Sequence, residues 1–176
     1  MRTLALLRGA NVGGARKLPM AALERAFRAA GARATETVIQ SGNVVFEADD
    51  PDAAARAAAE TIEAELGFRP AMILRSAAAW RAMVERNPFV AAGSSSDILH
   101  AACLAAPPGA GIAAALDPES FAPDAFVVAG ADVYLRLPNG AGRANLTNAR
   151  LDRALRTIST MRNWRTVLKL MERLEA

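Results

Sequence analysis

Two short apolar segments end in polar turns that contain glycine, and the residues in these turns suit the binding of an anion. Glycines let backbone N–H groups turn towards a ligand, while arginine and lysine supply positive charge. The spacing of the glycines matches neither a P-loop nor a dinucleotide-binding fingerprint, so it names no reaction. The alternative is structural: a tight connection followed by a hairpin turn. The candidate ligand-binding residues of the two turns are Arg8, Asn11, Gly13, Gly14, Lys17, Gln40, Ser41 and Asn43.

A further group of polar candidates lies near the C-terminal end of the chain. Arg143 and Asn148 flank the start of an expected helix, where positive charge opposes the helix dipole and suits a bound anion. Arg162, Asn163 and Trp164 precede the last expected helix. We interpret Asn163 as the cap of that helix and Trp164 as packed inward, with stacking on a ligand as the alternative. These five residues complete the set of candidate ligand-binding residues.

The sequence contains one histidine, His100, and one cysteine, Cys103. It therefore excludes cysteine-rich zinc sites, multi-histidine metal sites and an internal disulfide. Strand alternation places these two residues on opposite faces, so they do not form a Cys–His pair. No paired carboxylates stand out either, and we assign no catalytic residue, metal or cofactor. Any chemistry is expected to depend on binding and charge stabilisation.

Length and composition set broader limits. A chain of 176 residues, 52% of them hydrophobic, is long enough to bury a core. The net charge of +3 is mild, so the excess of arginine is only weak evidence for a nucleic-acid partner. No apolar run approaches the roughly 20 residues of a membrane span, and the apolar stretch before Arg8 is too short for a signal peptide. We therefore expect a cytoplasmic protein without membrane association.

The elements expected to position the first two turns follow the order β-α-β-β-α-β. Strands are predicted at residues 3–8, 35–40, 43–47 and 71–74. One helix runs from Pro19 to Gly31. A second, expected to turn Ile62 and Leu66 inward, runs from Asp50-Pro51 to Gly67. This order predicts an α+β, ferredoxin-like (split β-α-β) fold with an antiparallel sheet of strand order 4-1-3-2. In that topology residues 8–17, 40–43 and 67–70 meet at one end of the sheet.

The second half of the chain is predicted to be a partly similar β-α-β-β-α arrangement. Strands are expected at 98–105, 126–128 and 132–137, with a short helix at 111–116 between the first two. A following helix holds Leu151, Leu155 and Ile158, and the last helix turns one face inward, with Trp164, Val167, Leu168, Met171 and Leu174. The Ser- and Gly-containing stretch at 91–97 resembles a linker, which predicts domains at 1–90 and 98–176.

Several motifs in order along nearly the whole chain carry a resemblance to a known family. They are LLRGANVGG followed by KLPM, then IQSGNVVF, NPF, LHAACL, GRANLTNARL and RNWRTVLKL. Together they resemble the bacterial domain-of-unknown-function family 1697. The resemblance implies a small, soluble α+β bacterial protein and supplies neither an activity nor catalytic residues. One departure is that Ala144 and Asn145 stand where members of the family tend to have serine and lysine.

The sequence thus favours binding of a small phosphorylated or carboxylated anion, and it leaves open whether the protein is an enzyme. The first alternative is a nucleic-acid-binding module that contacts the phosphate backbone through arginines. Base stacking is disfavoured, because the first strand has no aromatic residue and the third has only Phe46. The second alternative is a protein-interaction scaffold, which exposure of Trp80 or Trp164 would support. The sequence does not define an oligomeric state.

Overall fold

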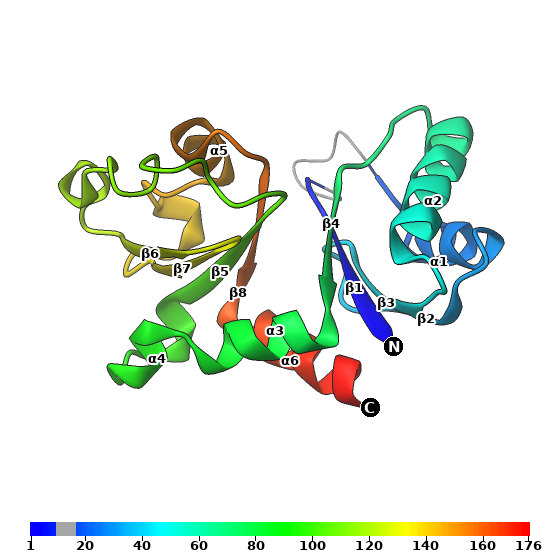
Figure 1. Cartoon of the computed structure of the whole chain (residues 1–176), viewed down its shortest axis with the longest axis horizontal. Coiled ribbons are helices and arrows are strands. Elements are labelled where there is room, and N and C mark those ends of the chain that lie inside the picture. Colours follow the sequence, from blue (N-terminus) through cyan, green and yellow to red (C-terminus); the bar gives the residue numbers. More distant parts are fainter. Residues whose placement is uncertain (10–16) are drawn as a thin grey trace. The chain divides into compact units, whose positions relative to one another are not determined.

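The computed structural model describes residues 1–9 and 17–176 of the chain, which divides into two compact units (Figure 1). The first unit comprises Met1–Arg81 together with Leu170–Ala176, and the second comprises Ala82–Lys169. The divisions fall within helices α3 (Ala77–Glu85) and α6 (Trp164–Glu175). The stretch at 91–97, expected to be a linker, lies inside the second unit.

The first unit contains the predicted ferredoxin-like arrangement. Its elements are β1 (Arg2–Leu7), α1 (Met20–Ala29), β2 (Arg33–Thr37), β3 (Asn43–Glu47), α2 (Pro51–Leu66) and β4 (Met72–Ser76). All strand pairs are antiparallel and the sheet order is β2-β3-β1-β4, which confirms the predicted order. Helices α1 and α2 cover one face of this sheet (Figure 1). The α+β class is likewise confirmed.

Local signals explain where the two helices of this unit begin and end. The Asp50 carboxylate accepts a hydrogen bond from the Ala53 N–H at 2.9 Å, and Pro51 occupies the first turn of α2. Gly67 then ends α2 in the left-handed conformation, at φ 74°. The core beneath both helices includes Phe27 of α1 and Phe46 of β3, whose ring centroids lie 4.8 Å apart.

Two details of this unit differ from expectation. The strand expected to reach Gln40 ends at Thr37, and the connection to β3 is a five-residue turn. The Val38 N–H donates a hydrogen bond to the Asn43 carbonyl at 2.9 Å, and this bond closes the turn. The strand therefore ends earlier than the apolar pattern indicates. Leu66 was expected to point inward but is 38% exposed, because it occupies the last turn of α2.

The second unit contains a sheet with an equivalent strand arrangement. Its strands are β5 (Leu99–Leu104), β6 (Ala125–Ala129), β7 (Asp132–Arg136) and β8 (Ser159–Asn163), in the order β6-β7-β5-β8. Helix α5 (Asn148–Leu155) packs on one face, over a core that includes Leu104 and Leu135 (Figure 1). The short helix α4 (Pro88–Ala91) precedes β5 and contacts β7.

The structure corrects three expectations for this unit. Residues 111–116 form turns and no helix, since Gly111 adopts φ 79° and the segment is too short to be stable as a helix. The helix expected to include Ile158 ends at Leu155, and Ile158 is 47% exposed. Strand β8 follows, and it was not predicted. Helix α6 buries Trp164, Val167, Leu170 and Leu174, whereas Leu168, expected to be inward, is 40% exposed. None of the helices in the described part of the chain is long and apolar enough to cross a membrane.

Candidate functional site

Main-chain hydrogen bonds bring three distant segments of the first unit together where β1 ends. The Leu7 N–H donates to the Gly42 carbonyl at 2.8 Å, which attaches the end of β1 to the β2–β3 turn. The Arg8 N–H donates to the Ala71 carbonyl at 2.9 Å, which attaches the next residue to the loop that enters β4. The predicted meeting of these segments is therefore confirmed for the described residues.

Asn43 organises the β2–β3 turn from inside. Its side chain is fully buried, and the amide Nδ2 donates to the Val38 carbonyl at 2.8 Å and to the Ser41 hydroxyl at 3.0 Å. An amide group has two donor hydrogens, and both are directed into the turn. Asn43 was a candidate for ligand contact, and its position supports a role in holding the turn.

The tip of this turn presents an exposed apolar residue that the sequence analysis did not single out. Ile39 adopts φ 62°, in the left-handed region, and its side chain is 43% exposed. β-branched residues are rarely found in this region because the side chain crowds its own backbone. The neighbouring Gln40 is also exposed. Strain of this kind is common at binding and catalytic sites, which makes the turn a candidate binding element.

Positive charge at this end of the sheet comes from residues on either side of the first loop. Arg8 follows β1 and is half-buried, while Lys17 is exposed and precedes α1. Ser41, half-buried in the turn, adds a hydroxyl group. The candidate residues Asn11, Gly13 and Gly14 lie outside the described residues.

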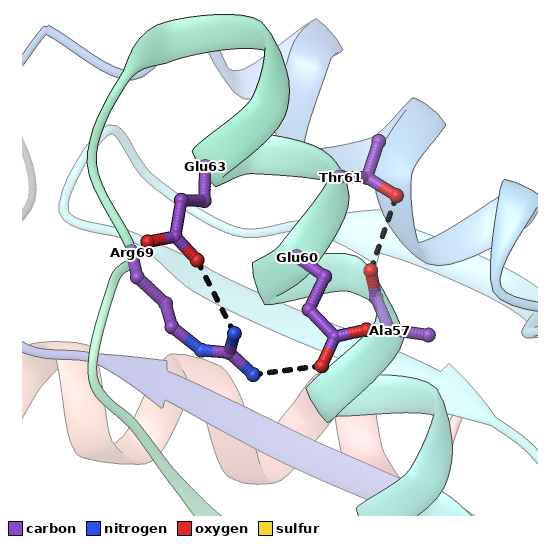
Figure 2. Close-up of polar contacts among 5 residues, drawn as sticks. All are labelled: Ala57, Glu60, Thr61, Glu63 and Arg69. Carbon is purple, nitrogen blue, oxygen red and sulfur yellow. Dashed lines mark hydrogen bonds and ion pairs between the residues drawn. The ribbon is translucent and has the colours of Figure 1, made fainter.

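Arg69, in the loop that leads to Ala71, is held by acids of α2. Its guanidinium donates to Glu60 at 2.9 Å and to Glu63 at 3.2 Å (Figure 2). These hydrogen bonds raise the pKa of Arg69, the one with Glu60 most strongly. Arg69 also lines a shallow pocket of about 210 Å³ between α2 and β4, together with Arg56 and Asp52. Its charge is thus matched by two carboxylates.

The candidates of the second unit occupy separate places. Arg143 is exposed in a short 3₁₀ turn, Ala141–Arg143. Asn148 begins α5, and its side-chain oxygen accepts from the Ser159 hydroxyl at 3.3 Å. The helix cap is Thr147, whose hydroxyl accepts from the Arg150 N–H at 3.3 Å. These contacts connect α5 to β8 and give Asn148 a structural role.

Arg162 is buried within β8, where it is only 8% exposed. It donates to the Thr160 hydroxyl at 2.8 Å and to the Met161 carbonyl at 2.9 Å. Burial lowers the pKa of Arg162 to about 10, and attraction from the nearby Cys103 opposes this effect. The guanidinium therefore remains charged at neutral pH, inside the sheet layer and away from solvent.

Asn163 and Trp164 behave as the structural interpretation predicts. The Asn163 side-chain oxygen accepts from the Thr166 N–H at 2.8 Å and so caps α6. Trp164 is 3% exposed and belongs to the core. Asn163 also lines a polar pocket of about 380 Å³ with Ser96, Asp97 and Arg165. In that pocket Asp97 and Arg165 form an ion pair with each other.

His100 and Cys103 are both buried on β5. Their partners in the neighbouring strands differ by an odd number of residues, which confirms that they face opposite sides of the sheet. Burial lowers the pKa of His100, and a backbone hydrogen bond with Ile98 partly opposes this. The imidazole is therefore neutral at physiological pH. No group of three His, Cys, Asp or Glu side chains suited to a metal ion occurs among the residues that the structure describes.

The fold and the site define an α+β protein with two similarly ordered antiparallel sheets and a candidate binding site at one end of the first. The chain belongs to the family described as Protein of unknown function (DUF1697), whose sequence profile matches residues 1–134. This confirms the resemblance found in the motifs.

Among solved structures, the chain is similar to the conserved bacterial protein SP0830 from Streptococcus pneumoniae. The two share 21% sequence identity with a TM-score of 0.71, over 99% of this chain and 98% of that one. A likeness at this level of identity shows the fold alone. A comparison with curated protein sequences gave no match.

Proposed function

We propose that the protein binds a small phosphorylated or carboxylated molecule where β1 ends. Arg8 and Lys17 supply the charge for the anion, and Gln40 and Ser41 supply polar groups from the β2–β3 turn. The observation that carries this proposal is the pair of main-chain hydrogen bonds from Leu7 and Arg8, which hold the turn and the β4 entry beside Arg8. Arginine is suited to such a role because its planar guanidinium can contact two oxygens of one anion.

The two alternatives gain less support from the same residues. Phe46, the only aromatic residue in the central strands of the first sheet, is fully buried against α1, where it does not stack with a base. Trp80 and Trp164 are 1% and 3% exposed, so neither offers an aromatic anchor to a partner protein. Phosphate-backbone contact through arginines remains the alternative function.

A thermal-shift screen of anions tests the proposal. Phosphate, phosphorylated metabolites and small carboxylates are added to the intact chain at increasing concentration. A ligand that binds only the folded state raises the unfolding temperature, and the rise continues with the logarithm of ligand concentration above the dissociation constant. We expect such a rise for the wild type and its loss in Arg8→Ala. Arg153→Ala is the matched control, because it removes the same charge from an exposed position of α5 in the second unit.

The proposal fails if no anion stabilises the wild type, or if Arg8→Ala responds as strongly as Arg153→Ala. Binding of RNA or DNA that weakens steeply with salt, together with no response to small anions, favours the nucleic-acid alternative.

A further inference from the structure

Ile39 combines two features that rarely occur together at one isoleucine. Its backbone is left-handed, at φ 62°, and 43% of its side chain is exposed. An exposed isoleucine alone is ordinary on a protein surface. A β-branched residue in the left-handed region is strained, and asparagine or glycine would adopt the same conformation with less strain. Neither full burial nor backbone preference therefore accounts for isoleucine at this position.

The surrounding structure holds Ile39 in this conformation from both sides. Val38, immediately before it, is 3% exposed and donates its N–H to the Asn43 carbonyl at 2.9 Å. The Asn43 amide returns a hydrogen bond to the Val38 carbonyl at 2.8 Å. The turn is further attached to β1 through the Gly42 carbonyl, which accepts from the Leu7 N–H. Ile39 is thus exposed to solvent in a turn that hydrogen bonds hold at Val38, Gly42 and Asn43.

The β2–β3 turn, which carries Ile39, is attached to the end of the strand that leads to Arg8. The Leu7–Gly42 bond joins the end of β1 to the turn, and the residues next to these two are Arg8 and Ser41. The β2–β3 turn therefore carries Ile39 and Gln40 alongside the segment that supplies the arginine.

We propose that the site takes an anion that carries an apolar group, such as an aryl phosphate or an arylacetate, and that Ile39 contacts that group. This inference rests on the proposed function and specifies its ligand class. Partial burial of a ring against one isoleucine side chain removes a few tens of Å² of apolar surface from water. At about 25 cal/mol per Å², this area corresponds to a preference of about fivefold for the aryl ligand.

Calorimetric titration of four probes tests the inference with the intact chain. Phenyl phosphate is compared with inorganic phosphate, and phenylacetate with acetate, so that the two anion chemistries are measured separately. The variants are Ile39→Asn, which tolerates the left-handed backbone without the apolar group, and Ile39→Leu, which keeps an apolar side chain. Arg8→Ala serves as the variant that removes the anion contact.

For the wild type we expect the aryl ligand to bind about fivefold more tightly than its unsubstituted partner in at least one pair. Ile39→Asn should bring that ratio close to one while leaving the affinity for the unsubstituted anion unchanged, and Ile39→Leu should retain the preference. The unfolding temperature of ligand-free Ile39→Asn should be equal to or above that of the wild type, since the strain is relieved.

The outcomes separate this inference from the proposed function. Ile39 does not select the ligand if the wild type and Ile39→Asn show the same preference for the aryl ligand, or if the wild type shows no preference. The anion site itself still stands in these cases, provided that Arg8→Ala abolishes binding. If none of the four probes binds the wild type, both proposals are overturned.

Discussion

Asn43 is the side chain on which the geometry of the proposed site most depends, and its replacement by alanine gives a quantitative test. The substitution removes two hydrogen bonds, to the Val38 carbonyl and the Ser41 hydroxyl, at a fully buried position. A buried hydrogen bond contributes about 0.5–1.5 kcal/mol, and a buried group left without a partner costs about 1–3 kcal/mol. We therefore expect Asn43→Ala to lower the free energy of unfolding of the first unit by about 2–3 kcal/mol.

Urea unfolding followed by tryptophan fluorescence measures this loss in the relevant unit. Trp80 belongs to the first unit and Trp164 to the second, so a Trp164→Phe background leaves Trp80 as the reporter. Ser41→Ala is the matched control, because it removes one acceptor and leaves the bond to Val38 intact. Ser41→Ala should lower the free energy of unfolding by about 1 kcal/mol or less.

The combined variant makes the test sharper. Because Asn43→Ala already breaks the bond to Ser41, adding Ser41→Ala should cost much less than Ser41→Ala costs alone, which is a measurable departure from additivity. Strict additivity, or an Asn43→Ala loss below about 0.5 kcal/mol, would show that Asn43 does not hold the turn.

Two further predictions concern the second unit. Burial, reinforced by Asp132, raises the pKa of Tyr134 from 10.0 to about 12, so the folded chain keeps this proton when the unfolded chain has lost it. The contribution of Tyr134 to the free energy of unfolding is therefore complete below pH 10, and it falls by roughly 1–3 kcal/mol as the pH rises towards 12. In a spectroscopic titration, this single tyrosine should have a pKa of about 12 in the native protein, compared with about 10 in urea. Equal titration midpoints in the two states would contradict this prediction. The buried Asp124 carboxylate accepts a hydrogen bond from the Leu146 N–H at 2.9 Å. In urea unfolding, Asp124→Ala should therefore lower the free energy of unfolding by about 1–3 kcal/mol, and Asp124→Asn, which keeps an acceptor oxygen, should lower it by less. Equal losses for the two variants would refute an acceptor role for Asp124.

Much of the first unit could be predicted because its boundaries depend on local chemistry. Asp50 and Pro51 define the start of α2, and Gly67 defines its end, from their own backbone preferences. Once the order of elements is known, the topology itself places the end of β1 beside the β2–β3 turn. This is why residues more than thirty positions apart could be assigned to one site from the sequence.

Features that depend on tertiary contacts could not be predicted in this way. Strand β8 has the sequence STMRN, with no apolar alternation, and it exists because β5 supplies a partner for its backbone. Arg162 is buried there although arginine favours the surface. The left-handed Ile39 is equally unpredictable, since its conformation opposes the preference of isoleucine and depends on bonds made by Val38, Asn43 and Leu7.

The second sheet offers an internal comparison that bears on where the site lies. At the end of β5, the Leu104 N–H donates to the Ala131 carbonyl and the Ala105 N–H donates to the Ile158 carbonyl, each at 2.8 Å. These bonds repeat the pair made by Leu7 and Arg8, in a sheet of the same strand order. The position of Arg8, however, is occupied by Ala105.

The hairpins next to these equivalent strand ends also differ. β6 and β7 are joined by only Gly130 and Ala131, whereas the β2–β3 turn spans five residues and presents Ile39 and Gln40. Convergence of three segments is thus a property that both sheets share. At the positions of Arg8 and the β2–β3 turn the second sheet has Ala105, Gly130 and Ala131, and its exposed apolar residue at this end is Ile158, at the entry to β8. The proposed function therefore depends on the side chains at the converging end of the first sheet and not on the fold alone.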